Sequence, residues 1–388
     1  MEWPVYIKLS ALWFFEFAVW GAWMPVLAAR LLGPLQMSGK QTGWIYAALP
    51  LASMVSPLMF GWLADTYVNV EMLLFVSHVI GAVLLFVVAK QKKFAGVFGV
   101  MLLYSFFFAA TLALVNVMVF RHVPGSEAPK IFIWAPIAWA LAGYFLTGMR
   151  QMRKAEGDGS DALYLAAILS VVLAAVCLVQ PATPPVASQG QPMAQAFSML
   201  QQPSYLIFII VSFAVSGMMQ FYFQGSAPFM QQMGISSKNV PATMAIAQAM
   251  QAIATWAALG WLWANAGPKW TLVIGSACWA GLFFIYVLGQ PRWLIVVGQS
   301  LHGLAYVFFI NGGWMFTDAA APKEISASAQ ALLILATNGL GLFMGTQLAG
   351  FTMDMANTGG QFQWRRVWIV PTAIALGGAL ILAAAFHP

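Results

Sequence analysis

Charged residues are scarce in this sequence. Only 7% of its 388 residues are Asp, Glu, Lys or Arg, whereas 61% are hydrophobic. Soluble domains carry about 25% charged residues, and a soluble chain of this length could not cover its surface with so few charges. A surface that faces lipid needs none. The composition therefore excludes a soluble globular fold and indicates a polytopic membrane protein.

Cysteine and paired histidine are also scarce. The two cysteines, Cys177 and Cys278, lie inside apolar runs, which argues against a disulfide framework. The four histidines are scattered without the spacing of a metal site, and the sequence has no Ser/His/Asp arrangement and no glycine-rich phosphate loop. We therefore expect no enzyme, no metal and no cofactor.

Three further features are absent, and each excludes a class of partner, of function or of targeting segment. The net charge of +6 is small, and no Lys/Arg block alternates with aromatic residues, so nucleic-acid binding has no support. No loop is long enough to form the soluble output domain that a membrane sensor commonly needs. Residues 1–30 lack the basic start, short apolar run and small-residue cleavage site of a signal peptide. The lipid bilayer is the partner that the sequence does predict.

Apolar windows of about 20 residues predict membrane-spanning helices. We expect an all-α membrane protein with twelve such helices, at residues 6–32, 41–63, 71–89, 95–120, 131–149, 161–180, 204–229, 240–263, 269–289, 293–317, 326–351 and 365–386.

A segment rich in proline separates the first six spans from the last six. Residues 181–203 carry no charge and five prolines, and we interpret them as a central linker with a short helix around 193–200. The predicted organisation is a six-helix bundle at 1–180, the linker at 181–203 and a second six-helix bundle at 204–388.

The two halves of the sequence also contain similar motifs at similar positions. GWLADTY begins at residue 61 and GWLWANAG at residue 260, 199 positions later, while APK recurs at 128 and 321, 193 positions apart. Similar offsets near half the chain length indicate an internal repeat. Because six is even, both copies insert in the same orientation, and two parallel six-helix repeats describe the major facilitator fold, with substrate expected at the midplane between the halves.

The charge distribution and the loop motif disagree on orientation. A cytoplasmic N-terminus places five of the 17 Lys and Arg residues inside, whereas the positive-inside rule favours the opposite topology. GWLADTY at 61–67 resembles the loop that facilitators keep on the cytoplasmic side. We therefore expect both termini in the cytoplasm, in a monomer of the cytoplasmic membrane.

Amide side chains inside the membrane spans indicate a pathway for a polar substrate. Gln220 and Gln224 share one helical face, and so do Gln248 and Gln251 on the following span. Amides both donate and accept hydrogen bonds, which suits a neutral, polar solute such as a nucleobase or a sugar. The alternative is that each amide joins neighbouring helices. Two same-face pairs favour a substrate site, to which we add Asn116, Asn311 and Asn338.

A carboxylate lies in the first span. Glu16, Trp20 and Trp23 form one stripe of that helix, and an acid at membrane depth is a functional hypothesis by default. Burial favours its protonated form, so Glu16 is predicted to bind substrate hydroxyls or a proton. His302 is the ionisable partner that we consider for it, although a neutral packed histidine is the commoner case. The loop acids Asp65 and Asp318 are predicted gating elements, with solvated loop charge as the alternative.

Several motifs in order are more specific than any one alone. They are Phe15, Phe17, Trp20, Gly21 and Trp23 in span one, GWLAD after span two, LALVN in span four, IAQAMQ in span eight, FFINGG in span ten, SASAQALLILATNGLG in span eleven and WRRVW before span twelve. Together they resemble the nucleoside:proton symporter family of the major facilitator superfamily, over nearly the whole chain.

The resemblance implies uptake of nucleosides driven by a proton gradient. Gln220 and Gln248 match amides that line the family's nucleoside site, and Asn116 and Asn338 match its asparagines. Three positions depart from the family: Gln251 and Val307 replace acids in spans eight and ten, and Phe132 replaces a basic residue in span five. Two interpretations remain open, that Glu16 has taken over proton binding or that the chain is an uncoupled facilitator. A sugar transporter of the same fold is a further alternative.

Overall fold

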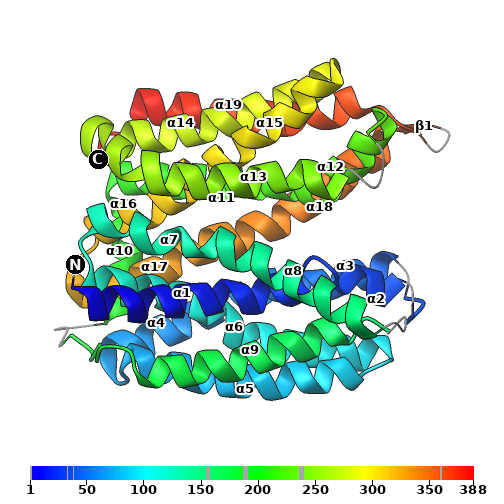
Figure 1. The fold of residues 1–388 in the computed structure, drawn as a ribbon. Helices are drawn as coiled ribbons and strands as arrows, with labels where there is room; N and C mark the ends of the chain where they lie inside the picture. The colour runs from blue at the N-terminus through cyan, green and yellow to red at the C-terminus, as the bar shows by residue number, and fades with distance from the viewer. Residues whose placement is uncertain are drawn as a thin grey trace. The chain divides into compact units, whose positions relative to one another are not determined.

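The structure is a computed structural model that describes residues 2–32, 34–37, 39–153, 158–186, 191–235, 240–358 and 361–388. The described residues are almost entirely helical (Figure 1). The chain divides into two compact units, which we call unit 1 (Met1–Ala196 with Pro322–Leu335) and unit 2 (Phe197–Ala321 with Ala336–Pro388).

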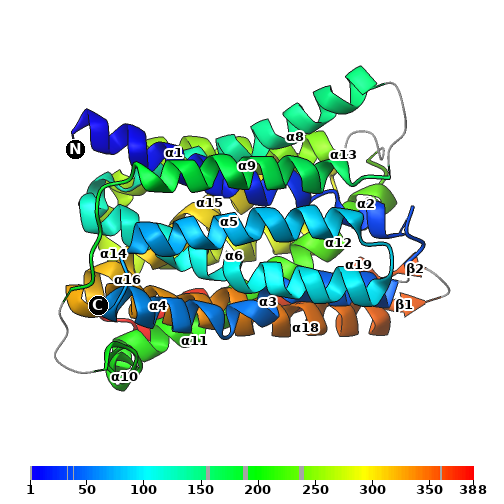
Figure 2. The ribbon, with the colours of Figure 1, turned by 90° about the horizontal axis from the view of Figure 1, so that it is seen from below.

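Unit 1 is a bundle in which one helix comes from late in the sequence. Helix α9 lies between α5 and α1, and α6 packs against α5, α3 and α4 (Figure 2). Its helices are α1 (Trp3–Trp23), α2 (Leu27–Leu32), α3 (Gly39–Ser53), α4 (Ser56–Thr66), α5 (Val70–Lys90), α6 (Phe94–His122), α7 (Pro129–Phe132), α8 (Trp134–Arg153), α9 (Asp161–Leu178) and α17 (Ser326–Ile334).

Unit 2 is a second helical bundle with a small hairpin, in which α14 packs along both α19 and α15. Its helices are α11 (Pro203–Gly217), α12 (Met219–Gln232), α13 (Val240–Ala254), α14 (Gly260–Leu288), α15 (Arg292–Ala305), α16 (Gly312–Ala320), α18 (Leu342–Met355) and α19 (Trp364–Ala385). Strands β1 (Asn357–Thr358) and β2 (Gln361–Phe362) pair antiparallel, with Asn357 opposite Phe362.

Eleven helical stretches of the described chain are long and apolar enough to cross a membrane. Ten of them each match one predicted window, and the other, Thr243–Leu288, covers two windows in 46 residues. One crossing needs about 20 residues. The backbone leaves helical geometry at Gly267, with φ 73° and ψ 178°, and Pro268 follows. The predicted all-α membrane fold is confirmed. The break at Gly267 favours two crossings within Thr243–Leu288. The count of twelve spans stays a prediction.

The predicted linker contains the expected short helix. This helix is α10 (Pro192–Ser198), and a 3₁₀ turn (Met199–Gln201) follows it, while residues 187–190 of the linker lie outside the described residues. The start of the linker is fixed to unit 1, because Thr183 donates its backbone N–H to Glu71 Oε2 at 2.9 Å and its hydroxyl lies 2.7 Å from His122 Nε2. The domain limits at 180 and 203 stay predictions.

Wide π-helical turns interrupt three spans of the second half of the sequence, at Thr255–Leu259, Tyr306–Asn311 and Leu335–Gly341. Such turns are rare and often occur at functional sites. The third begins where α17, in unit 1, gives way to the part of the same span that belongs to unit 2.

Glycines allow two helices of unit 2 to touch backbone to backbone. A Cβ atom on Gly341 would lie 2.8 Å from the carbonyl oxygen of Phe213, and one on Gly345 would overlap the carbonyl of Gly217. The sequence Gly341-x-x-x-Gly345 is therefore a small-xxx-small crossing between α11 and the eleventh span.

We predict that Gly345→Ala destabilises the protein, because the added methyl group must push two backbones apart. The expected cost is about 1–3 kcal/mol, typical of overpacking. Gly350→Ala on the same helix is the matched control, since a Cβ there meets nothing within 4 Å. Thermal unfolding of the purified protein in detergent measures both, and equal melting temperatures would contradict the predicted crossing.

Candidate functional site

Asp65, at the end of α4, binds the start of α17. Its carboxylate is 1% exposed and accepts hydrogen bonds from the backbone N–H of Ser328 at 2.8 Å, the Ser328 hydroxyl at 2.7 Å and the N–H of Ala327 at 3.3 Å. Free N–H groups and the helix dipole make a helix N-terminus a favourable place for a carboxylate. Asp65 thus caps α17 from another helix.

The GWLAD motif explains this contact. Gly61 lies one turn before Asp65, and a Cβ atom on it would come 3.0 Å from the carbonyl oxygen of Ala327. The glycine allows α4 to approach closely enough for the aspartate to reach the amides. Arg121 adds charge at the same place, with its Nη2 3.7 Å from Asp65 Oδ1 and 3.0 Å from the carbonyl oxygen of Lys323. The second predicted gating acid, Asp318, is half-buried on α16 in unit 2.

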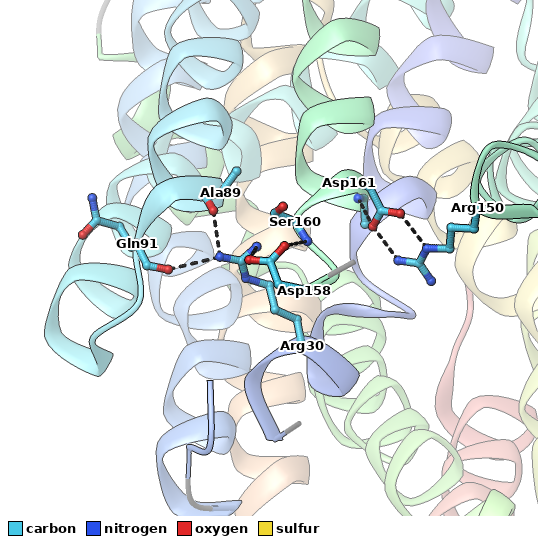
Figure 3. A network of polar contacts seen from close by, with 8 residues as sticks. Arg30, Ala89, Gln91, Arg150, Asp158, Ser160 and Asp161 are labelled. Atoms are coloured by element: carbon cyan, nitrogen blue, oxygen red, sulfur yellow. Dashed lines mark hydrogen bonds and ion pairs between the residues drawn. The ribbon is translucent and has the colours of Figure 1, made fainter. Parts of the chain in front are cut away.

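A network of two arginines and two aspartates lies near the C-terminal end of α5 (Figure 3). Arg30 is 2% exposed, and its Nη2 donates to the carbonyl oxygens of Ala89 at 2.7 Å and Gln91 at 3.2 Å, while Nη1 lies 3.3 Å from Asp158 Oδ2. Burial lowers the pKa of Arg30 and the charge of Asp158 partly offsets this. Arg150 donates two hydrogen bonds to the carboxylate of Asp161, each 2.7 Å long (Figure 3). These contacts tie helix ends of unit 1 together.

Glu16 lies in the middle of α1 and is completely buried. His78 Nε2, from α5, lies 2.9 Å from Glu16 Oε2, and the Thr111 hydroxyl, from α6, donates to Glu16 Oε1 at 2.6 Å. Among the described residues Glu16 has no Lys or Arg in ion-pair contact. An imidazole and a hydroxyl are therefore the groups that offset the cost of burying this acid.

The remaining neighbours of Glu16 are neutral groups. Tyr104 on α6 and Cys177 on α9 both interact electrostatically with it and are 1% and 0% exposed. On the same helix, Trp23 is buried with its ring centroid 5.9 Å from that of Tyr104, and half-buried Trp20 packs edge-on against Trp139 at 5.4 Å. The predicted stripe of α1 is thus an aromatic-lined region inside unit 1.

Asn116 lies one and a half turns beyond Thr111 on α6. It is 0% exposed, and its Nδ2 donates to the carbonyl oxygen of Leu112 at 3.2 Å. Its Oδ1 has no hydrogen-bond partner among the described residues. A buried carbonyl oxygen without a donor is uncommon and calls for a partner such as water or substrate.

The predicted glutamines lie in unit 2, on consecutive helices. Gln220 and Gln224 on α12 and Gln248 on α13 are half-buried, while Gln251 is 6% exposed. Gln251 marks the crossing of α13 with α15, because a Cβ on Gly303 would lie 2.7 Å from its backbone nitrogen. A π-helical turn starts four residues later.

The two other asparagines lie in π-helical turns. Asn311 ends one turn and is 3% exposed, and Asn338 lies within another, half-buried, with its Oδ1 3.4 Å from the Thr337 hydroxyl.

His302 lies inside unit 2 and is 3% exposed. Its ring stacks on Tyr222 with centroids 3.9 Å apart, and its Nδ1 receives the indole N–H of Trp279 at 3.4 Å. Tyr222 continues the network by donating to Gln299. The described residues thus pair His302 with aromatic neighbours, and they pair Glu16 with a different histidine.

Neither His78 nor Thr111 is among the site residues predicted from the sequence. His78 interrupts the apolar run at 71–89, and a histidine at that depth meets the same criterion that singled out Glu16. The sequence could therefore have indicated His78 as a candidate. It could not indicate that His78 meets Glu16, because the two residues lie on different predicted spans. Thr111 carried no signal, since threonine is common in membrane helices.

Comparison with solved structures defines the class. The crystal structure of the nucleoside transporter NupG matches with a TM-score of 0.72, at 23% identity, covering 99% of each chain. The human organic anion transporter MFSD10 matches with a TM-score of 0.76, at 12% identity, covering 98% of this chain and 99% of that one. The chain has the major facilitator fold, and its apolar helical stretches make it a multi-pass membrane protein.

Comparison of sequences then defines the family. The family model described as nucleoside H+ symporter matches residues 4–388, so the chain belongs to that family and is a transporter, not an enzyme. From Escherichia coli, the putative nucleoside transporter YegT is 28% identical, covering 93% of this chain and 89% of its own length, and the nucleoside permease NupG is 25% identical, covering 98% and 94%. The xanthosine permease is 22% identical, covering 97% and 94%. The resemblance inferred from the motifs is confirmed.

We predict that Asp65→Ala lowers stability by about 3 kcal/mol or more, because it leaves Arg121 without its buried partner and two amides of α17 without acceptors. Thermal unfolding in detergent measures the loss. Asp354→Asn, at an exposed acid of α18, is the control and should leave the melting temperature unchanged. An unchanged melting temperature in the Asp65 variant would show that the cap is dispensable.

Proposed function

We propose that this protein carries nucleosides across the cytoplasmic membrane by alternating access, in symport with protons, and that Glu16 binds the proton. The family match over residues 4–388 supports the substrate class and the driving ion, as do relatives named as nucleoside permeases. We further propose a monomer with both termini in the cytoplasm.

The observation that carries the coupling role is the burial of Glu16. Among the described acids, Asp65 and Glu71 are also buried, but Asp65 is committed to capping α17 and Glu71 accepts hydrogen bonds from Asn69 and Thr183. Both lie at helix ends. Glu16 is the buried acid at the centre of a span, where the cost of charge is highest.

Three positions at which the resemblance implies ionisable groups hold none here. Gln251, Val307 and Phe132 are uncharged and 6%, 0% and 1% exposed. A proton-coupled member with these replacements needs another group that gains and loses a proton, and Glu16 meets that need. This supports the first of the two open interpretations, in which Glu16 has taken over proton binding.

We assign substrate contacts to the polar and aromatic groups predicted from the sequence. The side-chain amides of Gln220, Gln224 and Gln248 have no hydrogen-bond partner among the described residues, and Asn116 has a buried oxygen without one. Half-buried Trp20 offers a ring for stacking on a base. The other members of the proposed set are Trp23, Gln251, Asn311 and Asn338. Thr111 donates to one oxygen of Glu16 and His78 lies 2.9 Å from the other, so we assign that acid first to the proton, and its contact with ribose hydroxyls stays a prediction.

We predict that Glu16→Gln abolishes accumulation driven by a pH gradient and spares exchange of labelled for unlabelled uridine in proteoliposomes. Glutamine keeps the shape of the side chain but cannot take up a proton. Wild type should accumulate nucleoside about tenfold per pH unit for one proton per substrate. The mutant should stop at equal concentrations inside and outside.

Glu2→Gln is the matched control, since Glu2 precedes α1 and is exposed. Accumulation by Glu16→Gln equal to that of wild type would refute the coupling role. Wild-type flux without any accumulation would establish the uncoupled facilitator. Inhibition of uridine uptake by glucose, together with saturable glucose flux, would favour the sugar transporter.

A further inference from the structure

We propose that His78 and Glu16 bind the transported proton as one unit and that the Thr111 hydroxyl adapts to both protonation states of the acid. This inference rests on the proposed symport and adds residues to its proton site. The three side chains come from α1, α5 and α6 and are 0%, 2% and 0% exposed, so they form a closed polar cluster inside unit 1.

The net charge of the pair depends on a single proton. With no proton between them, an ionised Glu16 and a neutral His78 carry one net negative charge. With one added proton the pair is neutral overall, whether the proton lies on the carboxylate or on the imidazole. Burial away from water penalises a net charge strongly. The occluded pair therefore retains its proton, and contact with water is what permits release.

The hydrogen bonds around the pair are incomplete. Glu16 Oε2 and His78 Nε2 lie 2.9 Å apart, but neither atom has an aligned hydrogen bond to a described residue. Most buried polar side-chain atoms have such a partner. Two titratable atoms 2.9 Å apart can share one proton, because either of them can hold it.

Thr111 suits either state of the carboxyl group. Its hydroxyl oxygen lies 2.6 Å from Glu16 Oε1 and 2.7 Å from the carbonyl oxygen of Phe108. A hydroxyl has one proton to donate and two lone pairs to accept with. When Glu16 is ionised, Thr111 donates to it. When Glu16 is protonated, the carboxyl group donates to Thr111, which turns its own proton toward Phe108.

No other described group competes for the proton. Tyr104, on α6, and Cys177, on α9, are the further titratable groups that interact electrostatically with Glu16, and neither carries a charge near neutral pH. From α8, the aromatic ring of Trp139 packs near α1 at Trp20. The backbone of His78 is held in place, because Ser170 donates to its carbonyl oxygen at 3.0 Å.

The test compares His78→Gln, Thr111→Val and Thr111→Ser with wild type in proteoliposomes. Three quantities are measured: uridine accumulation at a gradient of one pH unit, uridine exchange without a gradient, and proton entry per uridine with an enclosed pH-sensitive dye. His387→Gln is the matched control, since His387 is exposed near the C-terminus.

We expect His78→Gln to lower accumulation from about tenfold to about onefold and to lose proton entry per uridine, while exchange continues. Thr111→Val should reduce proton entry per uridine, and Thr111→Ser, which keeps the hydroxyl, should restore it. If His78→Gln does not fold, the comparison of Thr111→Val with Thr111→Ser decides.

A purely structural role has a different result. Exchange and accumulation would then fall in the same proportion while proton entry per uridine stayed at the wild-type value, and this would overturn the inference. If Glu16→Gln loses coupling and His78→Gln keeps it, Glu16 acts alone, so the inference fails and the proposed function stands. If wild type moves no uridine, the proposed function itself fails.

Discussion

The structure depends on one constraint: an ionisable side chain enters the membrane interior only with a group that offsets its charge. Two acids of unit 1 meet this constraint in different ways. Asp65 uses the amides at the start of a helix, with an arginine nearby, and its oxygens accept well-formed hydrogen bonds. Glu16 uses a histidine, whose own charge depends on a proton. The first arrangement joins two helices through a buried cap, and the second places two groups that can each hold a proton next to each other.

The difference also separates structural roles from functional ones. Three donors bind the carboxylate of Asp65, and releasing it requires α17 to move away from α4. Because α17 continues through a π-helical turn into unit 2, the span that carries this contact belongs to both compact units. The Asp65 contact is therefore suited to stabilising one conformational state, whereas the Glu16 pair is suited to releasing its proton in the state that admits water.

Much of the fold was available from the sequence, because apolar windows of membrane length leave few alternatives. The break at Gly267 follows from a glycine and proline in adjacent positions, and the crossing at Gly345 follows from glycine spacing. The partner of Glu16 was not available. His78 is 62 positions away on another helix, and helical periodicity says which residues share a face but not which faces meet.

Periodicity also loses accuracy where the helices change type. The spacing of Gln220 with Gln224 and of Gln248 with Gln251 lies within regular α-helix, so each pair shares a face as predicted. Asn311 and Asn338 lie in π-helical turns, where each residue advances around the axis by a smaller angle than in an α-helix. Face assignments carried through these turns from α-helical spacing are shifted, and no sequence signal marks where the shift begins.

The proposed proton site lies in unit 1 and the proposed glutamines lie in unit 2, whereas Asn116, also assigned to substrate, shares unit 1 with Glu16. In a carrier where proton and substrate compete for one carboxylate, each displaces the other directly. Here both oxygens of Glu16 are engaged inside unit 1, while the glutamines belong to unit 2. Under the proposed function, the proton and a nucleoside bound by the glutamines therefore influence each other through the conformations that each stabilises. Linkage then requires that the nucleoside strengthen proton binding by the same factor as the proton strengthens nucleoside binding.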